Sequence, residues 1–228
     1  MENGNRTPDT RHRTPSRLSR LIFVADGFTR SRVADVVLDL GRGGVLPWVH
    51  LRDHDCDEGG FRLAARSLVD ALRAESPETM ISFNGHADLA RELGVGLHIG
   101  FRGPGPRRAR ELVGPGSVFG YSVHAKADLP KSVIAIIDYS IIGPIYDSIS
   151  KPNLTATSTE LLANIVDISS KPVFAIGGIR PQNVGECLQA GAYGVAVVGG
   201  ILEADEPVSS AEAYLRAVSK TETIDLTL

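Results

Sequence analysis

The sequence predicts an α/β protein with the (β/α)₈ barrel fold in a single domain. From Arg20 onward, short and almost uninterrupted apolar runs alternate eight times with longer amphipathic segments. Strands this apolar are typical of a parallel sheet covered by helices. A chain of 228 residues, of which 43% are hydrophobic, is long enough for one barrel and its core. Eight strand–helix units favour closure into a barrel over an open, doubly wound sheet.

The first half of the chain contains four of the expected strand–helix units. Each strand is a short apolar run, whereas each helix places apolar residues three and four positions apart. Glycines after the first and fourth helices are typical stop signals. The expected strands are residues 21–27, 45–53, 79–85 and 95–100, and the expected helices are residues 31–44, 61–72, 87–94 and 106–114.

The second half continues this alternation with one ambiguous element. The region from Lys126 to Ile137 should be the fifth helix, but it contains β-branched residues that favour a strand. Thr157 and Glu160 form a T-x-x-E capping box at the start of the sixth helix, and a proline lies near the start of the seventh. The expected strands are residues 117–124, 138–145, 172–178 and 194–200, and the later helices are residues 157–168, 181–192 and 209–220, the last of which opens on serine.

The two ends of the chain differ from the part between them. Residues 1–19 are expected to form a basic N-terminal tail, because the first twenty residues carry five arginines and show no apolar periodicity. This composition predicts a disordered segment. No apolar core follows the basic residues, so a signal peptide is not expected. The barrel domain is expected over residues 20–222, followed by a C-terminal tail at residues 223–228.

Composition and charge disfavour several classes of protein. The net charge of −3 gives no electrostatic reason to expect nucleic acid as a partner. Cys56 and Cys187, the only two cysteines, lack the spacing of a zinc site and favour a reducing cytoplasm. His50 and His54 have no third ligand nearby, so no metal site is expected. No apolar run approaches the roughly 18 residues of a membrane-spanning helix, so no membrane partner is expected.

Two pairs of glycines predict a phosphorylated ligand. In barrel enzymes the active site lies at the carboxyl ends of the strands, and the loops after strands seven and eight often bind phosphate. Gly177 and Gly178 follow the seventh expected strand, and Gly199 and Gly200 follow the eighth. Glycines there let backbone N–H groups approach an anion. Glycines that merely turn the chain are the alternative.

Polar side chains at other strand ends extend the candidate site. Arg52 suits a carboxylate or phosphate on a ligand, or it forms a structural ion pair with Asp53 or Asp55. Asn84 offers both a donor and an acceptor to a ligand, or it turns the chain together with Gly85. Both residues are therefore candidates for substrate binding.

A long polar loop after the sixth strand supplies three further candidates. Ser148, Ser150 and Lys151 offer two hydroxyls and an ammonium group, which could hold an anionic ligand. An ordinary surface loop is the alternative. The loop is therefore a candidate binding segment.

Several motifs taken together resemble the thiamine phosphate synthase superfamily. The similar stretches occur in the same order as in that superfamily, from Leu21 to Glu206, and read VHLRD, FNGHADLA, YSVHA, GPIYDSISKP, VFAIGGIRPQN and AGAYGVAVVGGI. The resemblance implies a (β/α)₈ barrel that binds a small phosphorylated thiazole, with a homodimer as a possible assembly.

Within this superfamily, the chain is more similar to the TenI-type thiazole tautomerases than to the synthases. The synthase branch joins the thiazole to a pyrimidine pyrophosphate and holds Mg²⁺ with aspartates after strands three and four. Gly85 and Gly103 stand at these positions here. Mg²⁺ prefers carboxylate oxygens, and these glycines supply none. No cofactor is therefore expected, and Mg²⁺ would be needed only if the chain is a synthase. The S-V-H motif from Ser122 to His124 matches the tautomerase branch, whereas the loop after strand six and Gly199 depart from it.

The resemblance implies that His124 is the catalytic residue of a metal-independent tautomerase. That reaction aromatises a carboxythiazole phosphate by moving a proton, which an imidazole with a pKa near 6.5 can accept and donate. Ser122 and Asn84 would orient the substrate, and Arg52 or Lys151 would face its carboxylate. Two alternatives are a thiamine phosphate synthase that holds Mg²⁺ with other carboxylates, and a non-catalytic, regulatory binder of thiazole or thiamine phosphate.

Overall fold

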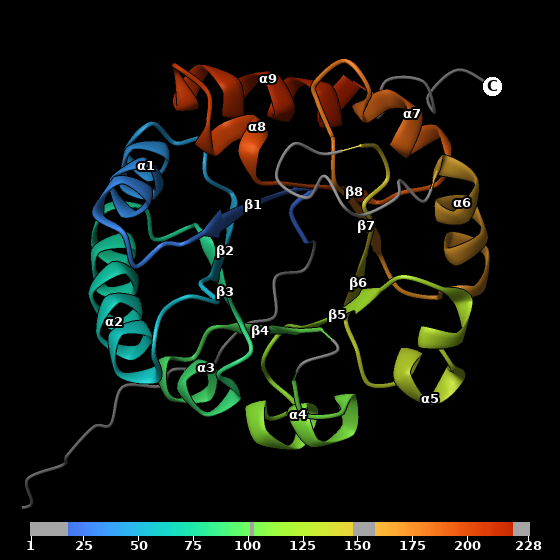
Figure 1. The fold of residues 1–228 in the computed structure, drawn as a ribbon, viewed down its shortest axis with the longest axis horizontal. Coiled ribbons are helices and arrows are strands. Elements are labelled where there is room, and N and C mark those ends of the chain that lie inside the picture. Colours follow the sequence, from blue (N-terminus) through green and yellow to red (C-terminus); the bar gives the residue numbers. More distant parts are fainter. Residues whose placement is uncertain (1–17, 101–102, 148–157, 221–228) are drawn as a thin grey trace, which may run out of the picture.

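The protein folds as a closed barrel of eight parallel strands (Figure 1). The computed structural model describes residues 18–100, 103–147 and 158–220. Each strand pairs with the next along the chain, and β8 returns to pair with β1. The strands are β1 Leu21–Asp26, β2 Trp48–Arg52, β3 Met80–Asn84, β4 Gly96–Ile99, β5 Phe119–Val123, β6 Tyr139–Ile142, β7 Val173–Ile176 and β8 Gly194–Val197. The expected (β/α)₈ fold is confirmed.

Helices surround the barrel as an outer ring (Figure 1). Among the described residues, none of them is both long and apolar enough to span a bilayer. The helices are α1 Ser31–Arg42, α2 Glu58–Glu75, α3 Ala87–Leu93, α4 Pro106–Val113, α5 Lys131–Ile134, α6 Ser158–Ile168, α7 Val184–Gln189, α8 Gly199–Leu202 and α9 Pro207–Ser219, and a 3₁₀ turn, η1, spans Lys126–Asp128.

Two helices begin earlier than expected because residues in the preceding turn favour helix initiation. α2 begins at Glu58 rather than Phe61, since the Asp57 side chain accepts a hydrogen bond from the backbone N–H of Gly60 at 2.7 Å. α9 begins at Pro207 rather than at the serines, because the fixed φ of proline suits the first helical position. The capping chemistry thus decides where these helices start.

Three other boundaries also differ from the expected ones. The ambiguous region after β5 forms only η1 and the short α5, which begins after Pro130. α7 begins at Val184, three residues later than expected. Gly199 and Gly200 do not end β8 but begin α8, a helical turn that the sequence did not predict. Thr157 of the expected capping box lies outside the described residues.

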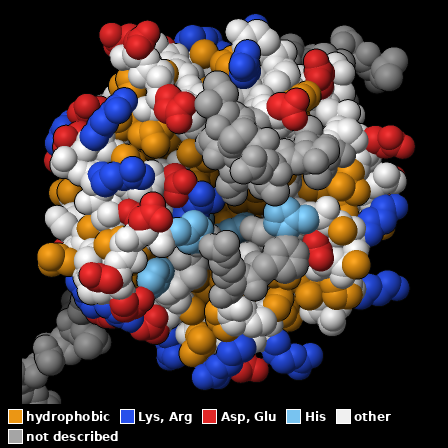
Figure 2. Space-filling view, in the orientation of Figure 1, with side chains coloured by type: hydrophobic (Ala, Val, Ile, Leu, Met, Phe, Trp, Pro, Cys, Tyr) orange, Lys and Arg blue, Asp and Glu red, His pale blue; other side chains and the backbone are white. Residues whose placement is uncertain are grey.

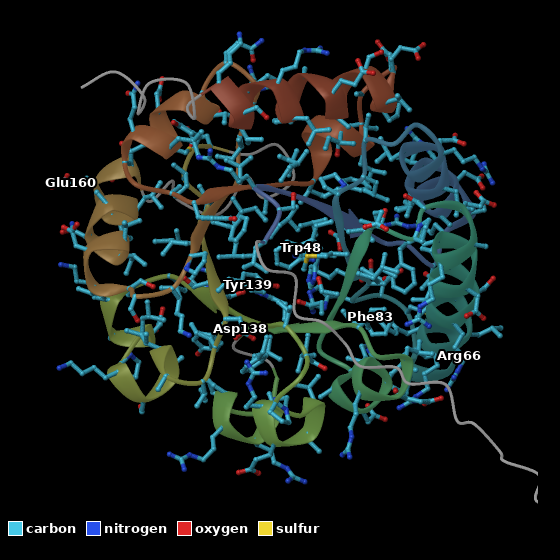
Figure 3. All side chains as sticks on the ribbon, turned by 180° about the vertical axis from the view of Figure 1, so that it is seen from behind. Trp48, Arg66, Phe83, Asp138, Tyr139 and Glu160 are labelled. Atoms are coloured by element: carbon cyan, nitrogen blue, oxygen red, sulfur yellow. The ribbon has the colours of Figure 1, made fainter. Side chains whose placement is uncertain are left out.

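Large aromatic side chains fill the amino end of the barrel interior. The Trp48 ring lies 4.9 Å from that of Tyr139 and 5.7 Å from that of Phe174, centroid to centroid, in edge-to-face contacts. Figure 3 shows Trp48 and Tyr139 inside the barrel, whereas Phe83 lies on the side of α2, where it contacts Phe61. Because alternate residues point in and out, the strands separate this interior cluster from the larger core under the helices.

The residues before β1 close the amino end of the barrel. The Tyr193 hydroxyl donates a hydrogen bond to the carbonyl of Leu18, and the Arg20 guanidinium donates to the carbonyl of Tyr193 at 2.8 Å. A Cβ atom on Gly194 would lie only 2.2 Å from the Arg20 carbonyl oxygen, so the backbones can approach only at a glycine. Leu18 and Ser19, which were assigned to the tail, therefore continue into the barrel floor. Leu18 also packs against the interior aromatic cluster at this end of the barrel.

Removal of one buried hydroxyl is expected to stabilise the fold. Ser140 in β6 is fully buried. Among the described residues, its Oγ is the one buried side-chain nitrogen or oxygen atom that has no hydrogen-bond partner. We expect Ser140→Ala to raise the free energy of unfolding by about 1 kcal/mol, measured by urea denaturation. Ser82→Ala is the contrasting variant, because its hydroxyl accepts from Trp48 at 2.9 Å. Destabilisation by Ser140→Ala would contradict this reading.

Candidate active site

The carboxyl ends of the strands surround a pocket of about 520 Å³. Figure 2 shows histidine side chains gathered around the middle of this face of the molecule. The candidates Ser148, Ser150 and Lys151 lie outside the described residues. The other eight of the eleven sequence-derived candidates line the pocket: Arg52, Asn84, Ser122, His124, Gly177, Gly178, Gly199 and Gly200. Their functional roles remain predictions.

Arg52 forms an ion pair with Asp26 at the edge of the pocket. The two residues end β2 and β1 and lie opposite each other in the strand register. The guanidinium donates to both carboxylate oxygens of Asp26, at 2.8 and 2.7 Å, which is the strong bidentate geometry. The expected alternative partners, Asp53 and Asp55, were therefore wrong. Asp53 instead accepts a hydrogen bond from the Thr29 hydroxyl at 2.5 Å.

Two buried histidines form the polar floor of the pocket. The rings of His50 and His98 lie 5.3 Å apart, and both side chains are almost fully buried. His50 Nδ1 shares a hydrogen bond with Ser82 Oγ at 3.0 Å, and His98 Nε2 shares one with Ser122 Oγ at 2.9 Å. His98 Nδ1 also lies 3.2 Å from the Tyr139 hydroxyl. The sequence interpretation missed His98 as a site residue.

The pattern that identifies His98 is its inward position on a buried strand. β4 reads as a continuous apolar run, in which one histidine is easily taken for core. His98 pairs with Asn84 across the register of β3 and β4. Both residues line the pocket. A polar residue on the inward face near a strand's carboxyl end is thus the signal to look for.

Burial holds both floor histidines in their neutral form. Desolvation, assisted by the positive charge of Arg52, lowers the pKa of His50 to about 3. The pKa of His98 is also lowered well below its ordinary value, mainly by desolvation and then by repulsion from His50. A neutral imidazole presents one donor and one acceptor. The floor therefore offers hydrogen bonds without charge.

Acidification is expected to destabilise the protein through these histidines. In the unfolded chain a histidine binds a proton near pH 6.5, whereas folded His50 binds one only near pH 3. Between these values the unfolded state holds more protons on His50, so its contribution to the free energy of unfolding falls by about 1.4 kcal/mol per pH unit as pH decreases. Above pH 6.5 this contribution is fully present.

The test compares the wild type with His50→Gln. Urea denaturation at several pH values between 4.5 and 5.5 gives the slope of stability against pH, and we expect about 1.4 kcal/mol per pH unit less slope in the variant. The remaining slope comes from His98 and the carboxylates, which both proteins share. Equal slopes for the two proteins would contradict the assignment of a neutral His50.

His124 lies at the pocket edge, directly after β5. Its Nδ1 lies 3.1 Å from the carbonyl oxygen of Gly143, so this nitrogen carries the hydrogen and donates. The backbone N–H groups of His124 and Ala125 both donate to Asp128 Oδ2, at 2.8 Å, which fixes the turn into η1. In this tautomer Nε2 is the acceptor nitrogen.

The loop after β7 needs glycine at two positions. Gly177 and Gly178 have φ values of +96° and +64°, a region that side chains rarely adopt. A Cβ atom on Gly177 would lie 2.5 Å from Pro144 Cβ, and one on Gly178 would lie 2.5 Å from the Asp147 carbonyl oxygen. Asn183 supports the loop by donating to the Gly178 carbonyl at 3.1 Å. The loop can therefore bring bare backbone to the pocket wall.

The loop after β8 carries a carboxylate of its own. Gly199 and Gly200 begin α8, and the Glu203 carboxylate oxygens lie 3.1 and 3.3 Å from the position that a Gly199 Cβ would occupy. All three residues line the pocket. A side chain at position 199 would therefore meet the end of the Glu203 side chain. Glycine at this position and glutamate four residues later fit each other sterically.

The pocket does not offer the carboxylate set that would hold Mg²⁺. Gly85 follows β3 and Gly103 follows β4, so neither of these positions supplies a carboxylate. Three other carboxylates line the pocket, from Asp26, Asp147 and Glu203. Among the described residues, however, no three acidic, histidine or cysteine side chains lie close enough together to hold a metal ion. The donor set therefore does not fit a Mg²⁺ site.

The fold and the pocket together define the class of protein. A closed (β/α)₈ barrel with a pocket at the carboxyl ends of its strands is the arrangement of barrel proteins that bind or convert small molecules. Residues 21–201 match the family model described as thiamine monophosphate synthase. The chain belongs to this family.

Curated relatives carry the synthase name. The chain is 32% identical over 217 residues to the thiamine-phosphate synthase of Mycolicibacterium gilvum, which covers 90% of this chain and 91% of that protein. It is 31% identical over 178 residues to the thiamine-phosphate synthase of Synechocystis sp., which covers 78% of this chain. The chain spans about half the length of that relative (51%) and of a similar one from Parasynechococcus marenigrum (50%).

Solved structures show the same fold. The thiamine phosphate pyrophosphorylase from Pyrococcus furiosus superposes with a TM-score of 0.76 at 20% identity, and the match covers 88% of this chain and 96% of that one. A thiamine phosphate pyrophosphorylase from Bacteroides thetaiotaomicron, also at 20% identity, superposes with a TM-score of 0.62 over 92% of this chain and 100% of that one. These matches support the barrel architecture.

The comparisons correct the function inferred from the sequence. The tautomerase reading, with His124 as its proton carrier, is contradicted because the relatives are named synthases. The family match does not distinguish the TenI-type branch. Gly85, Gly103 and the S-V-H motif from Ser122 to His124 favoured the tautomerase, whereas the relative from Mycolicibacterium gilvum, which matches over 217 residues, is named a synthase. The names of the relatives therefore favour the synthase over these local motifs.

Proposed function

We propose that this protein is a transferase of thiamine biosynthesis that joins a phosphorylated thiazole to a pyrimidine pyrophosphate and releases pyrophosphate. The observation that carries the proposal is the similarity to a synthase-named relative over 91% of that relative's length. The pocket supports it, because about 520 Å³ falls within the usual size of a small-molecule site. No oxidant or reductant is needed, because one bond forms as another breaks.

The pocket offers two chemically different regions for the two parts of such substrates. The neutral floor of His50, His98 and Ser122 suits the ring nitrogens and amino group of a heteroaromatic ring, since it offers donors and acceptors without charge. The rim carries Arg52 and the glycine loop around Gly178, which suit phosphate groups. We propose that the rings lie on the floor and the phosphates at the rim.

The rim groups would also lower the barrier to transfer. When the bond to pyrophosphate breaks, the leaving group takes the electron pair and gains negative charge. Guanidinium and backbone N–H donors that already face this charge stabilise it without reorganisation. The chemistry proposed here therefore needs positioning of two substrates and stabilisation of a leaving anion, and His124 is not assigned a proton-transfer step.

Pyrophosphate release tests the proposal directly. The full-length protein is incubated with the thiazole phosphate and the pyrimidine pyrophosphate, and released pyrophosphate and the coupled product are both measured over time. We expect both to accumulate in a one-to-one ratio, and neither to form when one substrate is omitted. Ligand binding without pyrophosphate release would refute the transferase and support a regulatory binder.

A further inference from the structure

A diphosphate ligand brings several negative charges into this pocket, and they need positive partners. Magnesium held by carboxylates commonly supplies that charge in proteins that bind such ligands. Here the donor set does not fit a metal, because glycines follow β3 and β4 and the remaining carboxylates do not converge. The internal segments outside the described residues, 101–102 and 148–157, contain no aspartate or glutamate in their sequence. The pocket must therefore neutralise an anion in another way.

The three pocket carboxylates have different neighbours. Asp26 is engaged by both guanidinium donors of Arg52. Glu203 lies against Gly199 at the start of α8. Asp147 follows β6, and its backbone carbonyl lies beside Gly178. Among the described residues, none of them belongs to a group of three acidic, histidine or cysteine side chains that could hold a metal ion.

Among the described residues of the pocket, Arg180 is the arginine whose positive charge is not offset by an ion pair with a carboxylate. It follows the glycine pair after β7 and lines the pocket. The other described arginine of the pocket, Arg52, has its charge compensated by Asp26. Among the described residues, no carboxylate lies within ion-pair distance of the Arg180 guanidinium. Its charge is therefore available to a ligand.

The backbone around Arg180 is fixed although its side chain is exposed. The Arg180 N–H donates to the Asn183 side-chain oxygen at 2.8 Å, and the Asn183 amide donates to the Gly178 carbonyl at 3.1 Å. These two bonds tie the arginine to the glycine loop that lines the same pocket wall. A guanidinium on such a support can form paired hydrogen bonds to phosphate oxygens.

We infer that Arg180 is an anion-binding residue, and that this pocket binds a diphosphate group without a divalent cation. The choice of a diphosphate as the ligand rests on the proposed function. The glycine loop after β7 and Arg52 line the same pocket and offer further donors to an anion. The binding is thus carried by fixed donors and a guanidinium rather than by a metal bridge.

Calorimetric titration with inorganic pyrophosphate tests this inference. The full-length wild type is titrated once with MgCl₂ and once with excess EDTA, and we expect Kd values that agree within about twofold. Arg180→Gln should raise the Kd about tenfold, because a charge-assisted hydrogen bond of roughly 1.5 kcal/mol or more is lost. The matched control is Arg91→Gln on the exposed last turn of α3, which removes the same charge outside the pocket and should leave the Kd unchanged.

Two results would overturn the inference. Pyrophosphate binding that appears only with Mg²⁺ contradicts metal-independent binding, and equal Kd values for Arg180→Gln and Arg91→Gln contradict the role of Arg180. Measurement of pyrophosphate release separates this inference from the proposed function. Binding in EDTA without turnover would refute the transferase and leave the binding site intact. Turnover together with binding that requires Mg²⁺ would support the transferase and refute metal-independent binding.

Discussion

Arg52→Met is expected to lower the rate of pyrophosphate release by about a hundredfold or more, the loss that follows removal of one preorganised donor to a developing anion. Arg52 ends β2 at the pocket rim, and its bidentate bond with Asp26 holds the guanidinium in one orientation. The substitution removes the charge and also leaves the Asp26 carboxylate without a partner. Because the side chains are 18% and 35% exposed, we expect a stability loss of about 2 kcal/mol, less than for a fully buried pair.

A double-mutant cycle separates the catalytic effect from the structural one. Asp26→Asn combined with Arg52→Met removes both charges, so its stability should exceed the value obtained by adding the two single losses. Urea denaturation measures stability, and pyrophosphate release measures the rate. Strict additivity of the two stability losses would show that Arg52 and Asp26 do not stabilise each other. An unchanged rate in Arg52→Met would show that Arg52 does not belong to the proposed site. Arg52→Lys keeps the charge but not the paired geometry, so an intermediate rate is expected.

Gly178→Ala is expected to destabilise the protein by about 3 kcal/mol and to weaken pyrophosphate binding. The backbone φ of +64° is costly for alanine, and the added Cβ would lie 2.5 Å from the Asp147 carbonyl oxygen and 2.7 Å from Tyr146 Cβ. Strain of a left-handed residue contributes about 1–2 kcal/mol, and overpacking against backbone adds about as much. The loop after β7 must move, so the donors around the anion lose their positions.

Gly44→Ala is the matched control for this substitution. Gly44 has nearly the same φ, +67°, but a Cβ there would meet no atom within 4 Å. It should therefore show the backbone strain alone, about 1–2 kcal/mol, and should leave pyrophosphate binding unchanged. Urea denaturation and calorimetry of both variants provide the comparison. Equal stability losses at the two positions would show that the close contact with Asp147 is not rigid.

The sequence located those site residues that directly follow an apolar strand. Apolar runs separated by amphipathic segments predicted the order and number of strands, because a parallel strand buried on both faces has little room for polar residues. A polar residue after such a run must then lie at the carboxyl end of the barrel. This reasoning placed Arg52 and Asn84, and both line the pocket. It was less useful for β4, where His98 lies inside the apolar run itself.

The fine boundaries of helices depended on contacts that sequence periodicity does not contain. α8 begins at Gly199, a residue that extended apolar patterning assigned to the end of β8. The four-residue α5 replaced the longer helix expected after β5, because β-branched residues and Pro130 interrupt the helical pattern there.

The sequence by itself determined the barrel, the edge of the barrel that carries the pocket and the residues at its strand ends, because burial and side-chain alternation are local properties of each strand. Only the tertiary structure decided that Arg52 pairs with Asp26, that His50 and His98 meet as a neutral floor, and that the carboxylates among the described pocket residues do not converge on a metal. These properties depend on the register between strands and on loop conformation, which join residues distant in the sequence. The charge and the pKa of a side chain depend on these neighbours, so they cannot be assigned from the residue alone.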